Sequence, residues 1–269
     1  MCQLLSISAK LPVKFNTELE EFFSNSITHK HGWGYADFTK SDMFIMHEIF
    51  PAYESEYIEK MLSQPFYVQN ALFHIRYATI GTIELENCHP LTCDDVNHQK
   101  WTIVHNGTIF NSEKIDSFFT KQKGTTDTER LLLYIVDKIN EATLRENFHL
   151  SDKFKFKIIE DIINEIACGN KINIILYDGK FLYVHANSRS GGTILGEAGK
   201  NDFLYELDLK EGKVFSTKAL DNRNWIPVQL NTLLIYDDGI LVYKAHPHEC
   251  EYIESQEDIK YLYTHFSQL

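Results

Sequence analysis

Two long amphipathic segments lie in the middle of this chain, between two blocks of strand-like residues, and that order limits the folds open to it. Residues 126–142 and 151–169 place their apolar side chains at helical spacing. Thr126, followed three residues later by Glu129, matches a capping box at the start of the first helix. Strands that precede and follow a pair of helices favour an α+β layered fold over a βαβ repeat.

Shorter segments on both sides complete this pattern. Runs rich in β-branched and aromatic residues predict strands at 2–8, 32–38, 43–49, 71–78 and 101–106. Short helices are expected at 17–27, 55–62 and 255–266, and the composition of 187–202 indicates a loop. Residues 171–186 and 232–243 each predict a hairpin, with tight turns at Asp178-Gly179 and Asp238-Gly239.

Composition and charge exclude several classes of protein. The formal net charge of −12 is dispersed along the chain, which argues against a nucleic-acid partner because phosphate binding needs clustered Lys and Arg. No run approaches ~18 consecutive apolar residues, the length of a membrane span, and the N-terminus lacks the pattern of a signal peptide. We therefore expect a cytoplasmic protein that binds neither nucleic acid nor a membrane.

The cysteines give no sign of a disulfide framework. Their number, five, is odd and their spacing does not repeat, which is typical of reduced thiols. Cys88, Cys93 and Cys168 have no base nearby in the sequence. We expect these three to be ordinary thiols.

One cluster near the C-terminus raises the question of a metal. His246, His248 and Cys250 alternate in "AHPHEC", and on a strand their side chains would share one face. A fourth ligand and a paired motif are absent, so we predict an exposed terminal segment and no metal site.

Several short polar features recur where the predicted strands end. They are Arg76 and Thr79 in "HIRYATIG", His89 in "ENCHP", Asn106 and Gly107 in "VHNGT", and Asp127 in "GTTDTE". Each has an ordinary explanation. Asn-Gly is common in hairpin turns, Asp127 suits a helix N-terminus, Arg76 could form a structural ion pair, and His89 could be a loop residue.

A different chemistry follows if these features share one pocket. Arg76 offers a rigid fork for an α-carboxylate. Asp127 would accept hydrogen bonds from an α-ammonium group, so the pair would recognise the amino-acid end of a ligand. The Asn106 side-chain amide and the Gly107 backbone N–H are suitable donors for an oxyanion hole.

Such a pocket still needs a nucleophile and a base, and the sequence offers no local Ser–His or Cys–His pair. Cys2 supplies both if Met1 is removed, which its small side chain makes plausible. The thiol would attack, and the freed α-amino group, with a reference pKa of about 7.7–8.0, would act as base. The alternative is that Cys2 is a buried thiol at the start of a strand.

In combination these features resemble the class II glutamine amidotransferases, which are N-terminal-nucleophile hydrolases, and most closely their stand-alone type. The resemblance covers roughly residues 1–245 and passes, in order, through "MCQLLSISAKLPV", "HKHGWGYADF", "HIRYATIGTIELENCHPLT", "WTIVHNGTI", "GTTDTERLL", "NIILYDGKFLYVHA" and "STKALDNRNW". We expect residues 1–269 to form a single domain, with 246–269 as a C-terminal extension.

This resemblance implies a fold and a set of roles. The fold would be a four-layer αββα sandwich, in which two antiparallel sheets are flanked by helices. No cofactor is implied. The implied site residues are Cys2 as nucleophile, Asn106 and Gly107 as oxyanion hole, Arg76 and Asp127 as contacts for the α-carboxylate and α-amino group of a γ-glutamyl substrate, and Thr79 and His89 beside them.

Two positions depart from the pattern of similar proteins. His31 stands where they usually have Asp before Gly-Trp-Gly, which would alter polarity near the site. Ile80 stands before Gly81 where synthase-linked relatives often carry a polar residue, a mild argument against those branches.

Three functions agree with these observations. The first is hydrolysis of the γ-amide of glutamine or of another γ-glutamyl compound, through a γ-glutamyl thioester on Cys2. The second is a glutaminase subunit that passes ammonia to a separate synthase, or acts with a peptidase-like partner, since no further domain follows Leu269. The third is a non-catalytic binding module of the same fold. The leaving amine and the oligomeric state are not determined by the sequence.

Overall fold

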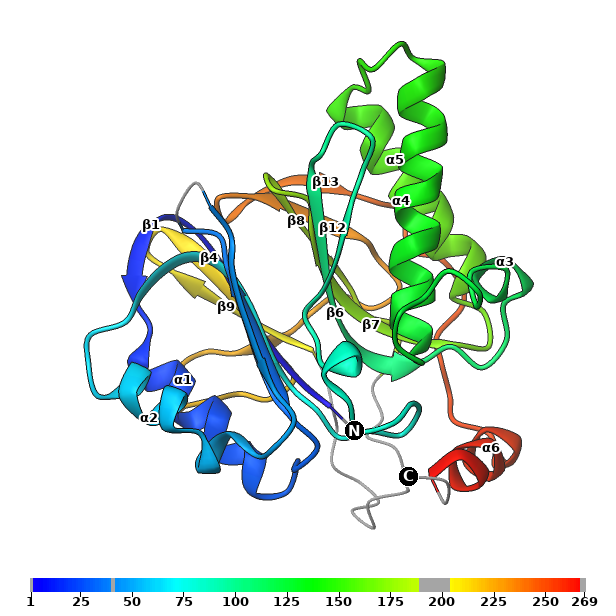
Figure 1. Ribbon diagram of the computed structural model, residues 1–269. Helices are drawn as coiled ribbons and strands as arrows, with labels where there is room; N and C mark the ends of the chain where they lie inside the picture. Colours follow the sequence, from blue (N-terminus) through cyan, green and yellow to red (C-terminus); the bar gives the residue numbers. More distant parts are fainter. Residues whose placement is uncertain (1, 40–41, 189–203, 267–269) are drawn as a thin grey trace.

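A computed structural model describes residues 2–39, 42–188 and 204–266 of the chain. Two antiparallel sheets pack face to face, and helices cover the outer face of each, so that four layers form (Figure 1). The α+β class and the αββα order predicted above are therefore confirmed. The predicted loop at 187–202 lies almost wholly outside the described residues.

The first sheet contains the beginning of the chain. In the described residues its strands are β1 (Gln3–Lys14), β2 (Trp33–Asp37), β3 (Phe44–Glu48), β4 (Tyr67–Ile75), β9 (Tyr205–Leu209), β10 (Gly212–Ser216) and β11 (Ile226–Pro227). Their order is β11-β9-β10-β1-β4-β2-β3. β1 pairs antiparallel with β4 on one side and β10 on the other. Its start is therefore fixed on both sides.

The second sheet is built mostly from the later part of the chain. Its described strands are β5 (Leu91–Asp94), β6 (Lys100–Thr108), β7 (Lys171–Tyr177), β8 (Phe181–His185), β12 (Leu234–Asp237) and β13 (Ile240–Lys244). Their order is β13-β12-β8-β7-β6-β5. The β7–β8 and β12–β13 hairpins turn at the two Asp-Gly pairs, with positive φ at Gly179 and Gly239, as predicted.

All but the last of the described helices divide between the two outer faces, and the last lies at the end where the N-terminus is found (Figure 1). The helices are α1 (Asn16–Ser24), α2 (Glu56–Leu62), α3 (Glu113–Asp116), α4 (Asp127–Arg145), α5 (Asp152–Ile166) and α6 (Gln256–Phe266), with 3₁₀ turns at Asn25–Ile27, Ala52–Glu54 and Leu85–Asn87. Thr126 caps α4, since its hydroxyl accepts the Glu129 N–H at 3.3 Å. The Glu129 carboxylate instead binds the N–H groups of Lys123 and Gly124, so the predicted capping box is only half formed.

Successive side chains of a strand point to opposite faces of its sheet, and the apolar ones form three layers. On β1, Leu5 and Ile7 face α1 and α2, whereas Leu4 faces the other sheet. On β6, Ile103 joins the layer under α4 and α5, whereas Val104 meets Leu4 between the sheets. Each strand thus has apolar side chains on both faces, which holds the four layers together.

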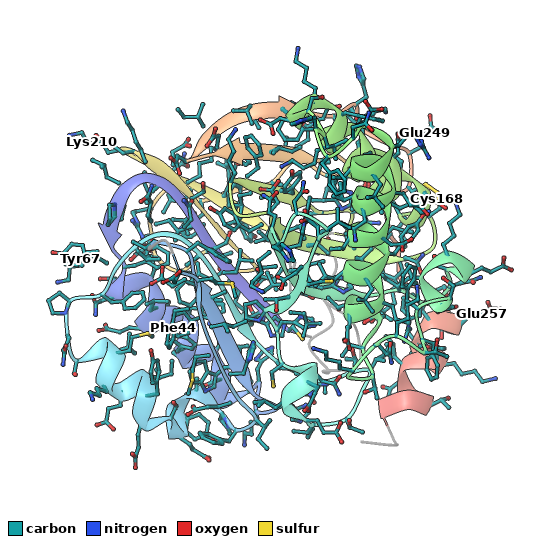
Figure 2. The ribbon with its side chains drawn as sticks, turned by 45° about the horizontal axis from the view of Figure 1, so that its top comes forward. Phe44, Tyr67, Cys168, Lys210, Glu249 and Glu257 are labelled. Carbon is teal, nitrogen blue, oxygen red and sulfur yellow. A yellow bond between two sulfur atoms is a disulfide. The ribbon has the colours of Figure 1, made fainter. Side chains whose placement is uncertain are left out.

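The prediction for Cys168 is wrong. This residue follows α5 and forms a disulfide with Cys250, with Cα atoms 4.8 Å apart (Figure 2). The two residues are separated by 82 positions, so no local spacing could reveal the pair. Cys88 and Cys93 are free thiols, as predicted. The odd number and irregular spacing of the cysteines therefore do not mean that all five thiols are reduced.

The C-terminal His and Cys residues also differ from their predicted arrangement. β13 ends at Lys244, so His246, His248 and Cys250 do not alternate on a strand. The His248 ring faces the buried His185, with the two Nε2 atoms 2.9 Å apart. Among the described residues, no group of three or more His, Cys, Asp or Glu is placed to hold a metal ion, and no helix is long and apolar enough to cross a membrane.

Candidate active site

Segments that are distant in the sequence meet at one end of the sandwich, where β1 and α4 begin and β6 ends (Figure 1). Gln3 pairs with Ile75, so Cys2 lies beside the end of β4, which is followed by Arg76. Asn106 belongs to the other sheet, yet its side-chain Nδ2 donates to the Cys2 carbonyl oxygen at 2.8 Å. The structure therefore brings together Cys2, Arg76 and Asn106.

The Cys2 sulfur lies against the main chain of Tyr77. Its Sγ accepts the Tyr77 N–H at 3.4 Å and is 3.5 Å from the Tyr77 carbonyl oxygen. The residue is half-buried and its thiol is free. Part of Cys2 is therefore accessible at the surface.

Asn106 and Gly107 do not form a hairpin turn. Both lie within β6, where they pair with Asn173 and Ile172 of β7. A side chain at Gly107 would collide with the Lys171 carbonyl, so the close approach of β7 requires glycine here. The Asn106 side chain is fully buried beside Cys2.

Arg76 is buried but only partly satisfied. Its Nη2 donates to the carbonyl oxygens of Ile80 and Gly81, at 3.3 and 3.2 Å. Its Nη1 is buried without a hydrogen-bond partner, and among the described residues Arg76 forms no ion pair. Burial lowers the pKa of Arg76, although a guanidinium stays protonated in proteins. The arrangement leaves one end of a buried cation available to an anion.

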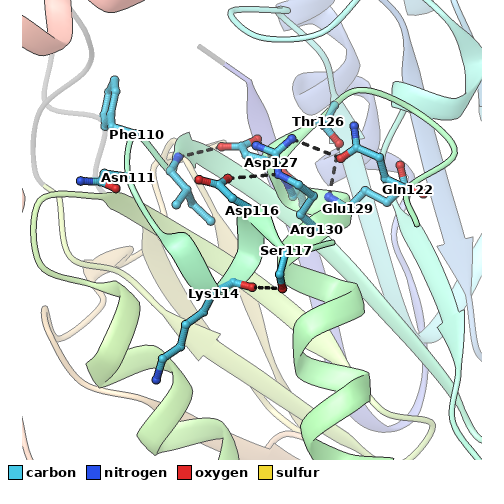
Figure 3. A network of polar contacts seen from close by, with 12 residues as sticks. Phe110, Asn111, Lys114, Asp116, Ser117, Gln122, Thr126, Asp127, Glu129 and Arg130 are labelled. Atoms are coloured by element: carbon cyan, nitrogen blue, oxygen red, sulfur yellow. Dashed lines mark hydrogen bonds and ion pairs between the residues drawn. The ribbon is translucent and has the colours of Figure 1, made fainter. Parts of the chain in front are cut away.

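Asp127, the first residue of α4, is a buried anion. It is 5% exposed, and its oxygens accept the backbone N–H groups of Ile109 at 2.7 Å and Thr128 at 2.9 Å (Figure 3). Among the described residues, no Lys or Arg forms an ion pair with it. A carboxylate held by two main-chain donors keeps its orientation and retains further lone pairs for a cationic ligand.

Thr79 and His89 differ in their burial. Thr79 is half-buried, three residues beyond Arg76. His89 is 6% exposed, and its ring packs against His74 with centroids 4.4 Å apart. Burial, followed by the neighbouring His74, lowers the pKa of His89 well below 6.5, so this residue is a neutral part of the interior.

The sequence reasoning did not single out His105, which lies directly behind the site. Its Nδ1 is 2.9 Å from the Thr128 hydroxyl, and its Nε2 is 3.0 Å from the Lys171 carbonyl oxygen. It therefore joins the start of α4 to β6 and β7. Burial lowers the pKa of His105, while Asp127 acts in the opposite direction. The only signal available was its place before Asn106 in "VHNGT".

The role of His31 can now be described. Its ring stacks on Tyr77 at 4.8 Å, and its Nδ1 accepts the Ala78 N–H at 2.9 Å. Burial and the nearby Arg76 lower the pKa of His31. A neutral imidazole thus supports the main-chain segment that contacts the Cys2 sulfur.

Comparison with known proteins identifies the family of this chain. The family model described as "Glutamine amidotransferases class-II" matches residues 1–259. An Escherichia coli protein, provisionally named a glutamine amidotransferase, is 25% identical over 191 residues, which are 70% of this chain and 74% of that protein. An uncharacterized protein of Methanocaldococcus jannaschii is 23% identical over 258 residues, covering 90% and 71% of the two chains.

Solved structures show the same fold. A predicted glutamine amidotransferase from Pseudomonas aeruginosa matches with a TM-score of 0.59 and 18% identity, over 90% of this chain and all of that one. Glutamine phosphoribosylpyrophosphate amidotransferase from Bacillus subtilis matches with a TM-score of 0.62 and 15% identity, over 92% and 50% of the two chains. The architecture is thus that of these amidotransferases, and the chain belongs to the class II glutamine amidotransferases.

Proposed function

We propose that this protein hydrolyses the γ-amide of glutamine or of a related γ-glutamyl compound through a thioester on Cys2. The observation that carries the proposal is a pair of buried charges, one just after β4 beside Cys2 and one at the start of α4, that form no ion pair among the described residues. Within residues 2–39, 42–188 and 204–266, Arg76 presents an Nη1 without a hydrogen-bond partner, and Asp127 presents a carboxylate without a counter-ion. A zwitterionic amino-acid end would complete both groups, since a buried charge is stable only when it is paired.

The proposed reaction begins after removal of Met1. The free α-amino group of Cys2 takes the thiol proton, and the sulfur attacks the γ-carbonyl carbon. The carbonyl π electrons move to oxygen, and the Asn106 side-chain amide and Gly107 N–H would stabilise this oxyanion. The C–N bond then breaks, and the leaving amine receives the proton held by the α-amino group.

Water completes the cycle. It attacks the thioester carbon while the α-amino group takes its proton, and the C–S bond breaks to release glutamate and the Cys2 thiol. In this scheme residues 1–269 act as one glutamine amidotransferase domain. Delivery of the ammonia to a separate synthase is the alternative, and copurification with such a partner, with weak hydrolysis by the isolated protein, would favour it.

Intact-mass spectrometry tests the central claim. Purified protein is measured before and after reaction with a diazoketone analogue of glutamine. We expect a chain that lacks Met1 and gains one adduct, which peptide mapping places on Cys2. The Cys2→Ser variant should gain no adduct, whereas Cys93→Ser, which removes another free thiol, should still gain one. An adduct on any other residue contradicts the mechanism.

A further inference from the structure

Three aromatic side chains lie next to Ile109, whose N–H binds the Asp127 carboxylate. They are Phe110, Tyr252 and Tyr261, and we call them the aromatic wall. The Phe110 ring stacks on Tyr252 with centroids 5.9 Å apart, and it meets Tyr261 edge to face at 5.5 Å. Tyr252 is only 6% exposed, so the inner part of the wall is buried. Two of its three rings, those of Tyr252 and Tyr261, come from the C-terminal segment, residues 246–266.

That segment is fixed to the sandwich before it reaches the wall. The Tyr252 N–H donates to the Asn187 carbonyl oxygen at 2.7 Å, and the Asn187 side chain donates to the Cys250 carbonyl oxygen at 3.2 Å. Cys250 is also joined to Cys168. The Tyr252 hydroxyl donates to Asp258 in the first turn of α6, at 3.1 Å. These bonds set the position of α6.

The wall is connected to Asp127 through two consecutive residues. Ile109 donates its N–H to Asp127, and Phe110 follows it directly (Figure 3). The Phe110 N–H donates to the Asn170 side chain at 2.7 Å, which fixes the main chain between the wall and the carboxylate. Burial raises the pKa of Tyr261, and the charge of Asp127 raises it further, so its hydroxyl is neutral and within electrostatic range of Asp127.

We propose that α6 forms the outer side of the γ-glutamyl site, and that Tyr261 restricts the site to substrates with an unsubstituted α-amino group. The inference rests on the proposed function, since it concerns the end of the substrate that Asp127 would bind. Tyr261 would be a specificity-determining residue, because it limits what is attached to the α-nitrogen and takes no part in the reaction at the γ-carbon.

The physical reason combines charge and space. An acyl group on the α-nitrogen removes the positive charge that Asp127 requires, and it adds volume on the side where Phe110 and Tyr261 pack. Removal of the Tyr261 ring opens space for that added volume but leaves Asp127 in place. The variant should therefore accept N-acylated substrates better, while its chemistry at Cys2 is unchanged.

The experiment compares L-glutamine with α-N-acetyl-L-glutamine as substrates of the full-length protein. Tyr261→Ala should lower the preference for glutamine over the acetylated substrate, as a ratio of kcat/KM values, by about three- to tenfold, the scale of one lost aromatic contact. The kcat for glutamine should stay within about twofold of wild type. Tyr263→Ala is the matched control, because Tyr263 lies on the same helix and is 54% exposed.

A second variant separates a wall from a general loss of structure. Tyr261→Phe keeps the ring against Phe110, so it should retain the wild-type preference; a Phe variant as permissive as the Ala variant would overturn the proposal. Equal preference in wild type, Tyr261→Ala and Tyr263→Ala would overturn it as well. If wild-type protein neither hydrolyses glutamine nor reacts with the diazoketone at Cys2, the proposed function itself fails, and this inference fails with it.

Discussion

The side-chain amide of Asn106 donates to the carbonyl oxygen of Cys2 at 2.8 Å, and this bond joins the two sheets where the chain begins. Cys2 precedes the first strand of one sheet, and Asn106 is near the end of a strand in the other. The proposed nucleophile and the proposed oxyanion donor are thereby held in one geometry by the packing of the sandwich.

Replacement of the nucleophile should abolish turnover with little effect on folding. We expect Cys2→Ala to reduce kcat for glutamine by at least about a thousandfold, because the thiol forms the intermediate. Ammonia release measures activity, and circular dichroism measures folding. Cys93→Ala should remain active, since Cys93 is a half-buried thiol on β5. Turnover by Cys2→Ala at the wild-type rate would refute the thioester.

Arg76→Lys should weaken substrate binding more than it slows the reaction. Lysine keeps a positive charge but loses the planar fork that suits a carboxylate, so we expect KM to rise about tenfold or more, with a smaller change in kcat. Steady-state kinetics over a wide glutamine range provide the check. Normal saturation by glutamine would mean that Arg76 has only a structural role.

Asp127→Asn should also act mainly on KM. The amide has nearly the shape of the carboxylate, but it lacks the charge that an α-ammonium group requires, and we expect KM to rise about tenfold. Asp116→Asn is the control, because Asp116 is a 60% exposed carboxylate whose Oδ1 lies 3.7 Å from Arg130. Equal effects of the two changes would argue against recognition of the amino group by Asp127.

Stability should fall in mild acid because of His185. Burial, followed by the neighbouring His248, lowers its pKa from 6.5 to about 3. A group whose pKa is lower in the folded state stabilises above its unfolded pKa, and this contribution is lost as the pH falls from about 6.5 towards 3. Between pH 7 and 4.5 the loss is about 2–3 kcal/mol.

Urea unfolding at several pH values measures this effect. His185→Gln should show a shallower fall of the unfolding free energy below pH 6.5 than wild type. His149→Gln, at an exposed position, should match wild type. Parallel curves for wild type and His185→Gln would mean that His185 is not responsible.

The disulfide between Cys168 and Cys250 should contribute to stability. It closes a loop of 82 residues, and on a chain-entropy model its removal by Cys250→Ser costs about 2–4 kcal/mol. Urea unfolding of the variant reports the cost, with Cys93→Ser as the control. Alkylation of unfolded wild-type protein should modify two more thiols after reduction than before, and an equal count in both would show that the bond does not form.

Local signals were sufficient for much of the fold. The Asp-Gly pairs set both hairpins, and Thr126 and Ser151 cap the long helices. β9 and β10 were not predicted, because their burial patterns are mixed and no clean alternation marks them. Such strands are defined by their pairing with each other and with β1, which no local pattern reveals.

The residue types of the proposed site could be named from the sequence, but their surroundings could not. Arg76, Asn106 and Asp127 carry functional groups whose chemistry can be recognised without coordinates. His105 could not be assigned, because a single His on a strand gives no pattern until Thr128 and Lys171 are placed beside it. The contact between Tyr261 and Phe110 likewise joins residues with no relation in the sequence.

The location of Cys2 and α6 at one end of the sandwich has a practical consequence for purification (Figure 1). A peptide tag at the N-terminus would keep the Cys2 amine inside an amide bond, and one after α6 would begin beside the proposed substrate site. The exposed turn between α4 and α5, around Asn147 and Phe148, lies at the opposite end of α4. A tag inserted there would leave both the amine and the wall undisturbed.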